Sequence, residues 1–322
     1  MKIIQNYING KFCKKEEIIE DINPATGKII ASIPKSNLDD VEKAVGAADE
    51  ARVNWSNLSL EERTNWLEKI AIVLESRSEE IASLESLDTG KPIALARAVD
   101  AARSVTNFRF FAEFARSYSE EKFEMEDATN HVILKPVGIA GLITPWNLPL
   151  YLLSWKIAPA IVMGNTVVAK PSELTPLTAN LLAEVIHEVG LPAGVVNIVH
   201  GLGSEVGQAI VEHPKVNLIS FTGGTQTGRK VAETASPMFK KLSLELGGKN
   251  ATIVLDDTNL DEAIPGIAKS AFMNQGQVCL CGSRIFISNK IWDVFIEKFI
   301  NYVEDMKIGD PSLEDSDLGS LV

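Results

Sequence analysis

The sequence has few cysteines, no long uninterrupted apolar run and no signal-peptide pattern, and each shortage excludes a class of protein. Three cysteines in 322 residues are too few for a paired disulfide framework, which indicates a reducing compartment. Prolines, a lysine and a glycine interrupt the longest apolar stretch, from Leu148 to Ala169, so it predicts no spanning helix. The first residues contain no apolar signal core followed by a cleavage site. We therefore expect a cytoplasmic protein.

The sequence also lacks an excess of positive charge. Acidic residues outnumber basic ones by 43 to 31, which gives a formal net charge of −12. Such a charge disfavours diffuse attraction to nucleic acid or to an anionic membrane, so neither is an expected partner. Cys279 and Cys281 lie two residues apart, but no second cysteine pair or nearby histidine completes a set of four zinc ligands. We expect no metal.

The length and the order of elements predict an α/β protein of two domains. A single hydrophobic core stops growing at roughly 250–300 residues, and this chain is longer. From Gly138 onward, short β-branched runs alternate with helical segments, which implies right-handed crossovers and an open, doubly wound, Rossmann-like parallel sheet. The expected strands are Ile139–Ile143, Thr166–Ala169, Val195–Val199 and Asn217–Phe221, and the helices between them are Pro176–Val189 and Ser204–Val211.

Local signals predict further elements. Asn9 and Gly10 stand between apolar residues, the strongest short hairpin signal. Ser59 and Glu62 form a capping box that predicts the start of a helix. The remaining expected elements are a helix over 94–114, strands over 242–246, 251–255 and 284–287, and a helix over 260–273.

A glycine-rich loop follows the expected strand Asn217–Phe221 and opens a helix. It contains Gly223, Gly224 and Gly228. Backbone N–H groups in such a loop, together with the helix dipole, can hold a pyrophosphate. The spacing differs from the dinucleotide fingerprint G-x-G-x-x-G, so the loop alone is weak evidence for a nucleotide.

Four segments carry a family resemblance. They are Thr144-Pro145-Trp146-Asn147, Lys170-Pro171-Ser172-Glu173, Leu244-Glu245-Leu246-Gly247-Gly248-Lys249 and Asn274-Gln275-Gly276-Gln277-Val278-Cys279. In this order, and with Asp21–Gly27 before them, the chain resembles the aldehyde dehydrogenase superfamily over its whole length. The resemblance implies an NAD-binding domain over 1–247, with a projecting hairpin near 118–136, and a catalytic domain over 248–322. Because chains of the family are longer, we expect the catalytic domain to be incomplete and the chain to be truncated at its C-terminal end.

The resemblance assigns the chemistry to three side chains. Cys279 attacks the aldehyde carbon, and the resulting thiohemiacetal loses hydride to NAD and becomes a thioester. Asn147 donates its side-chain N–H to the developing oxyanion, and Glu245 activates the water that hydrolyses the thioester. Without the resemblance, Cys279 reads as a buried structural cysteine, Asn147 as a turn residue and Glu245 as a solvent-facing strand residue.

The resemblance also implies a cofactor site. Lys170 and Glu173 would bind the adenosine ribose hydroxyls, and the carboxylate would repel a 2′-phosphate, so NAD is expected in preference to NADP. The alternative for this pair is a solvated ion pair ahead of the next helix. Gly224 stands where the family commonly has a serine, which removes one side-chain contact to phosphate. The expected cofactor cleft is lined by Thr144, Trp146, Gly223, Gly224 and Gly228.

Within the superfamily, the segments 102–108 and 148–156 look most like the 2-aminomuconic and 2-hydroxymuconic semialdehyde dehydrogenases. In that group an arginine at the position of Arg103 holds the substrate carboxylate, and a guanidinium suits bidentate carboxylate pairing. Trp155 matches an aromatic residue of the substrate tunnel. The alternatives are that Arg103 pairs with Asp100 or Glu113 on its own helix and that Trp155 lies in the core.

Two other functions remain open for the whole chain. The first is that of a truncated, non-catalytic chain that retains the NAD cleft. The second is that of an esterase or thioesterase that uses Cys279 without a cofactor. Ester hydrolysis with NAD omitted distinguishes the second alternative. We expect a small-molecule aldehyde as the substrate, and a homo-oligomer only if the missing C-terminal part is supplied.

Overall fold

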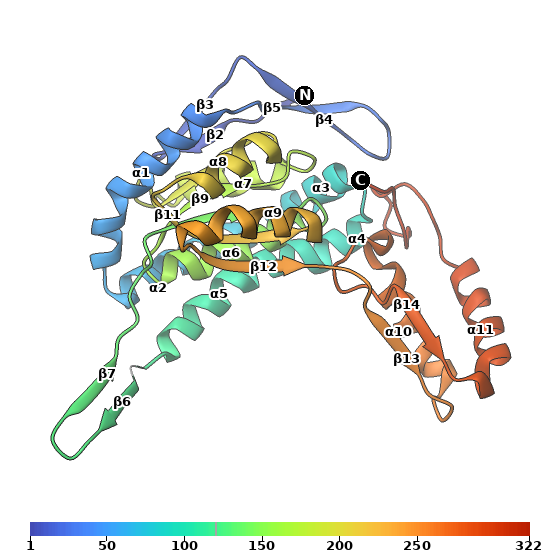
Figure 1. The fold of residues 1–322 in the computed structure, drawn as a ribbon. Helices are drawn as coiled ribbons and strands as arrows, with labels where there is room; N and C mark the ends of the chain where they lie inside the picture. The colour runs from blue at the N-terminus through green and yellow to red at the C-terminus, as the bar shows by residue number, and fades with distance from the viewer. Residues whose placement is uncertain (120) are drawn as a thin grey trace.

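A computed structural model describes residues 1–119 and 121–322 and shows a central α/β unit with a projection on each side (Figure 1). One projection is the antiparallel hairpin of β6 (Glu121–Glu124) and β7 (Thr129–Val132), whose residues are all exposed. Glu120, within the predicted hairpin range, lies outside the described residues. The other projection runs from β13 (Ala251–Val254) to α11 (Trp292–Glu304).

The central unit is built on a seven-stranded sheet. Its strands lie in the order β12 (Lys241–Leu246), β11 (Val216–Gly223), β8 (Ile139–Ile143), β9 (Thr166–Lys170), β10 (Val196–Ile198), β2 (Asn6–Ile8) and β3 (Lys11–Cys13). The first five are parallel, and β2 pairs antiparallel with β10. The chain adds β9 and β10 on one side of β8 and then β11 and β12 on the other. This reversal confirms the predicted open, doubly wound sheet.

Helices cover both faces of this sheet, and the strand residues alternate between two cores. Ala140 and Leu142 of β8 face one core, whereas Ile139 and Ile143 face the other. The first core lies under α2 (Leu60–Ser76), α3 (Ser78–Thr89), α5 (Ala102–Ser117), α6 (Pro149–Val162) and α7 (Leu177–Glu188). The second lies under α1 (Leu38–Asn57), α8 (Gln208–Glu212) and α9 (Thr225–Ala235).

The local signals correspond to observed elements. Asn9 and Gly10 have φ of 51° and 72° and form the turn between β2 and β3. Ser59 N–H donates to the Glu62 carboxylate at 2.7 Å, and Glu62 N–H donates back to Ser59 Oγ at 3.2 Å. The helix expected over Ser204–Val211 is split, because a π-helical stretch (Gly203–Gly207) precedes the short α8.

The remaining elements are smaller. β1 (Lys2–Ile3), β5 (Ile29–Pro34) and β4 (Ile18–Ile22) form a second sheet. A short α4 (Ile93–Leu95) and a π-helical stretch (Ala96–Ala101) lead into α5. In the C-terminal projection β13 pairs in parallel with β14 (Arg284–Ile287), and α10 (Leu260–Phe272) and α11 pack on this pair around the buried Phe295.

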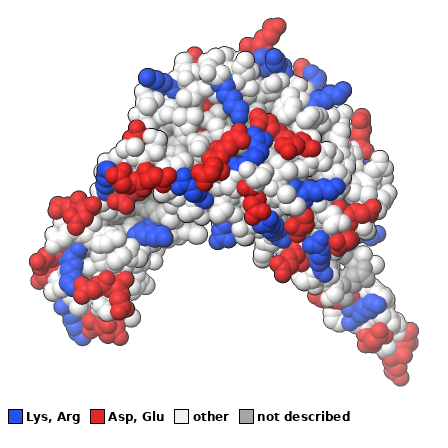
Figure 2. Space-filling view, turned by 180° about the vertical axis from the view of Figure 1, so that it is seen from behind, with Lys and Arg blue, Asp and Glu red and all other residues white. Residues whose placement is uncertain are grey.

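The surface carries both signs of charge. Acidic and basic side chains are interspersed over the face shown in Figure 2 and on both projections. No helix among the described residues has the length and apolar character needed to cross a bilayer. Within the same residues, no group of three or more histidine, cysteine, aspartate or glutamate side chains is placed to share a metal ion.

Candidate active site

Five of the predicted site residues, Trp146, Asn147, Gly223, Gly224 and Cys279, gather at the point where the strand order reverses. Because β8 and β11 lead to connections on opposite faces, the loops at their carboxyl ends separate and leave a crevice, the usual ligand site of such sheets. A cavity of about 280 Å³ occupies this position. Its lining residues are Pro145–Asn147 after β8, Thr222–Gly224 at the end of β11, Gly247, and Gly276–Cys279.

Cys279 is half-buried in the loop between α10 and β14. Its backbone carbonyl accepts hydrogen bonds from Asn250 Nδ2 at 2.6 Å and from Gly248 N–H at 3.4 Å. A Cβ on Gly247 would lie 2.6 Å from Cys279 Cβ and 2.9 Å from Cys279 Cα. Only a glycine therefore lets the chain leaving β12 pass so close to the thiol-bearing residue.

Asn147 connects the cysteine loop to the central sheet. Its Nδ2 donates to the carbonyl of Gln277, two residues before Cys279, at 2.7 Å. Its own carbonyl accepts hydrogen bonds from Asn274 Nδ2 at 3.1 Å and from Lys91 Nζ at 3.2 Å. The side-chain N–H predicted to stabilise an oxyanion therefore lies at the same cavity as the predicted nucleophile.

Glu245 lies near the cavity but does not line it. It is an exposed residue of the edge strand β12, paired in register with Thr222, and Gly247 two residues later reaches the cavity wall. Lys156 of α6, close enough to feel the charge of Glu245, is buried and donates to Ser220 Oγ at 2.7 Å. Burial lowers the pKa of Lys156 to about 8, although the charge of Glu245 acts in the opposite direction.

Lys170, the last residue of β9, forms an ion pair with Glu173. Lys170 is 3% exposed and Glu173 is 26% exposed, so the pair is mostly buried and not fully solvated as the alternative had it. Burial lowers the pKa of Lys170 despite the nearby carboxylate. For Glu173, burial acts to raise the pKa, but the charge and hydrogen bond of Lys170 outweigh it and the pKa is lowered. Glu173 Oε1 also accepts from Gly203 N–H at 3.2 Å, which fixes the carboxylate beside the sheet.

The predicted glycines have two different surroundings. Gly223 and Gly224 line the cavity, and α9 begins directly after Gly224. Gly228 lies inside α9, where an added Cβ would be 2.6 Å from Leu246 Cδ2, so it allows the helix to pack against β12. Trp146 lines the cavity, whereas Thr144 is buried and is not among the lining residues.

Arg103 is exposed in the first turn of α5, and its guanidinium lies 5.8 Å from the centre of the Tyr151 ring. Asp100 is not its partner, because both carboxylate oxygens of Asp100 accept from Lys91 Nζ at 2.9 Å. No acidic side chain within the described residues forms an ion pair with Arg103. Tyr151 is in the first turn of α6, four residues after Asn147, so Arg103 reaches the same end of that helix.

Trp155 is 42% exposed, so the alternative of a core residue is wrong. Its ring is stacked on Phe110 with centroids 6.2 Å apart and an interplanar angle of 8°, and it meets Phe111 edge-on at 5.0 Å. These aromatic side chains form a partly exposed apolar surface along α5 and α6.

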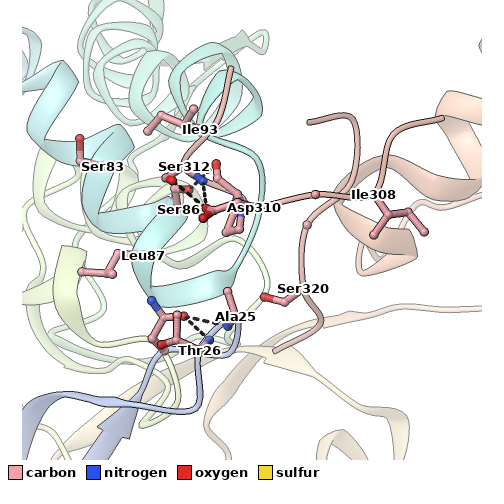
Figure 3. A pocket seen from close by; sticks show the side chains of 14 residues that line it. Ala25, Thr26, Ser83, Ser86, Leu87, Ile93, Ile308, Asp310, Ser312 and Ser320 are labelled. Carbon is pink, nitrogen blue, oxygen red and sulfur yellow. Dashed lines mark hydrogen bonds between the residues drawn. The ribbon is translucent and has the colours of Figure 1, made fainter. Parts of the chain in front are cut away.

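A larger cavity of about 780 Å³ lies elsewhere and contains none of the predicted site residues (Figure 3). It lies between the loop of Ala25 and Thr26, helix α3 and the segment from Ile308 to Ser320. Asp310, its acidic lining residue, accepts hydrogen bonds from the N–H and Oγ of Ser312. The converging functional groups therefore lie in the smaller cavity.

Two lysines near the site had no predicted role. Lys91 and Lys156 are 0% and 6% exposed, although each appears in the sequence as an ordinary lysine. The available signal for Lys156 is its position inside the apolar helix segment that follows Asn147. Lys91 stands between a glycine and a proline, and nothing in that local pattern indicates burial.

Comparisons with known family models, proteins and structures point to one family. A model described as the aldehyde dehydrogenase family matches residues 12–322. Human 2-aminomuconic semialdehyde dehydrogenase is 48% identical over 99% of this chain and 66% of its own length. The 2-hydroxymuconic semialdehyde dehydrogenase of Pseudomonas sp. (strain CF600) is 42% identical over 100% of this chain and 68% of its own. The NAD⁺ complex of a Bacillus cereus aldehyde dehydrogenase superposes with a TM-score of 0.97 at 36% identity, over 100% of this chain and 66% of that one. This chain thus spans about two thirds of the length of these relatives.

Proposed function

This chain belongs to the aldehyde dehydrogenase family, as its motifs predicted, and on that premise we propose that it carries the active site of an NAD-dependent semialdehyde dehydrogenase. The observation that best supports the proposal is the meeting of Cys279 and Asn147 at one cavity, where the strand order reverses. Neither residue is near the other in sequence. The fold and the Gly247 contact bring them together.

In the proposed reaction, the Cys279 thiolate forms a bond to the aldehyde carbon, and the carbonyl oxygen becomes an oxyanion. Asn147 Nδ2 stabilises that oxyanion as its negative charge develops. When bound, NAD supplies the hydride acceptor, and loss of hydride converts the thiohemiacetal to a thioester. Glu245 then takes a proton from a water molecule that attacks the thioester, which breaks the carbon–sulfur bond and releases the carboxylic acid and the Cys279 thiolate.

The residues present fit NAD. Gly223 and Gly224 end β11 without side chains and lead into α9, so backbone N–H groups are accessible to a pyrophosphate. Glu173 is held by Lys170 and Gly203 N–H as a charged acceptor for ribose hydroxyls. A charged carboxylate at this position repels a 2′-phosphate, which supports NAD over NADP. The Bacillus cereus relative was solved as its NAD⁺ complex.

The proposed substrate is an aldehyde that also bears a carboxylate, such as 2-aminomuconic or 2-hydroxymuconic semialdehyde. Arg103 supports this class because it is exposed beside Tyr151, at the end of α6 that carries Asn147. The names of the human and Pseudomonas relatives agree with it. A guanidinium that forms no ion pair with a described side chain can bind such a carboxylate through two hydrogen bonds.

The test is NADH formation by the purified chain with a carboxylate-bearing semialdehyde. Cys279→Ala should abolish NADH formation, because no other thiol lines the cavity within the described residues. Glu245→Gln should slow hydrolysis of the thioester, so the acyl-enzyme accumulates and is visible as added mass on Cys279. NADP should support a lower rate than NAD. Undiminished NADH formation by Cys279→Ala would contradict the mechanism. A cytoplasmic location and a homo-oligomer stay predictions.

A further inference from the structure

Lys91 is a completely buried lysine beside the proposed active site, and it is not part of the cavity wall. Its Nζ lies 2.9 Å from each carboxylate oxygen of Asp100 and 3.7 Å from Glu85 Oε2. All three side chains are 0% exposed. Removing such charges from water is costly, and apolar residues of similar volume often fill such a space without loss of stability. The cluster therefore calls for an explanation beyond stability.

Glu85 has a recognisable structural task. Its Oε1 accepts from Leu150 N–H at 3.0 Å, in the first turn of α6, and from Thr178 Oγ1 at 2.8 Å. It thus satisfies a free backbone donor where α6 begins. Asp100 neutralises Lys91. These contacts explain the two acids, but they leave one contact of the lysine unexplained.

That contact joins Lys91 Nζ to the carbonyl oxygen of Asn147 at 3.2 Å. Asn274 Nδ2 donates to the same oxygen at 3.1 Å, so two donors from distant parts of the chain hold one peptide group. The peptide after Asn147 links the site loop to α6. Fixing its carbonyl restrains the backbone from which the Asn147 side chain projects.

We propose that Lys91 is a positioning residue that holds Asn147 so that its side-chain N–H meets the oxyanion formed on attack by Cys279. The proposal rests on the oxyanion role assigned to Asn147 in the proposed function. An oxyanion donor acts through placement, and a displacement of about 1 Å can lower a rate by roughly 100-fold. Loss of Lys91 leaves the Asn147 carbonyl with Asn274 as its described donor, so the restraint is weakened and not abolished.

Two reactions of the same thiol separate positioning from general damage. Acylation of Cys279 by p-nitrophenyl acetate passes through a tetrahedral oxyanion and releases p-nitrophenolate, whereas displacement of iodide from iodoacetamide by the thiolate forms no oxyanion. Neither reaction needs NAD. In Lys91→Met, we expect acylation to slow by about tenfold or more and alkylation to change by less than about twofold.

Lys91→Met also leaves Asp100 buried without its partner, which can destabilise the fold. The double variant Lys91→Met/Asp100→Asn removes that unpaired carboxylate, and Asp100→Asn alone retains the lysine. We expect the acylation defect to persist in the double variant and to be absent from Asp100→Asn, with thermal melting of each variant as the check on folding.

Equal slowing of both reactions, or recovery of acylation in the double variant, would show that Lys91 is only structural and would overturn the proposal. Failure of p-nitrophenyl acetate to acylate the parent chain while alkylation proceeds would overturn it as well, because no oxyanion site would exist. Absence of NADH formation with the expected acylation pattern would instead contradict the proposed dehydrogenase function and leave the role of Lys91 intact.

Discussion

The chain up to Leu246 and the chain from Ala251 onward are both α/β, but they bury very different amounts of their residues. The first part surrounds seven strands with helices on two faces and encloses whole charged side chains such as Lys91 and Asp100. The second has two strands, and Ile253 and Phe286 are 70% and 53% exposed. The proposed nucleophile belongs to the less buried part. Its position must therefore depend on contacts with the larger part.

Those contacts are hydrogen bonds and close backbone approaches more than apolar packing. Gln275 Nε2 and Ser320 N–H both donate to the Gly90 carbonyl, at 3.4 Å and 3.0 Å. Ile93 N–H donates to the Pro311 carbonyl at 2.8 Å. Hydrogen bonds exchange with water and contribute about 1 kcal/mol each, so this junction is expected to open more easily than either core.

The strongest way to test the comparison is to create a cavity in each core. Phe108 and Phe295 are 0% and 1% exposed, in the core of the larger and the smaller part respectively. A phenylalanine-to-alanine change in a core costs roughly 3–5 kcal/mol. Phe108→Ala should lower the global free energy of unfolding by that amount. Phe295→Ala should instead open the residues after Ala251 locally.

Hydrogen exchange resolved along the chain measures the difference. In Phe295→Ala, amides of β13, β14 and α11 should exchange quickly while those of β8 and β9 stay protected. Equal loss of protection in both parts for both variants would show that the two parts unfold as one cooperative unit. It would contradict the expectation that the smaller part opens locally.

The next largest effect is expected in the segment that joins the two parts, between Leu246 and Ala251. Gly247→Ala places a Cβ against the Cβ and Cα of Cys279 and must displace the cysteine loop. A shift of about 1 Å at a reacting group corresponds to roughly a 100-fold loss of rate. Acylation of Cys279 by p-nitrophenyl acetate should fall by that factor. Gly266→Ala is the matched control, because an added Cβ there meets nothing within 4 Å.

The difference between the two parts also explains what the sequence could predict. The apolar runs sufficed for β8, β9 and β10, because these strands are buried on both faces of the sheet. Cys279 and Asn147 were found because their motifs are specific. Lys91 was missed because its burial depends on Asp100 and on the Asn147 carbonyl, which no local pattern connects to it. The exposure of Trp155 could not be predicted either, because it depends on what covers α5 and α6.

Buried acids make the stability of the larger part depend on pH. Burial raises the pKa of Asp21 from 3.8 to about 6, beside Asp88, whose pKa burial also raises. The folded state therefore binds the Asp21 proton more tightly than the unfolded state. This contribution to stability is complete below about pH 4 and is lost as the pH rises through about 6.

Asp21→Asn removes the ionisable group and should be more stable than the parent by about 2–3 kcal/mol at about pH 8, with no difference near pH 4. Denaturant unfolding at both pH values measures it. Tetramethylammonium buffers keep small cations from competing with the proton for the carboxylates. A stability difference that does not change with pH would show that Asp21 stays ionised in the folded protein.

The smallest expected effect tests whether recognition and chemistry are divided between the two parts. Arg103 belongs to the larger part and Cys279 to the smaller, so removing Arg103 should change substrate preference without changing the reactivity of the thiol. Arg103→Ala should lower kcat/KM for an ω-oxo acid by about tenfold or more, at 1.36 kcal/mol per decade, because the substrate carboxylate loses its partner. A neutral aldehyde of similar length should be little affected.

Arg109→Ala on the same helix is the control. Arg109 pairs with Glu75 at 2.6 Å, so its replacement should affect neither substrate. Equal losses for both substrates in Arg103→Ala would make Arg103 structural, and the carboxylate would then have to be recognised elsewhere.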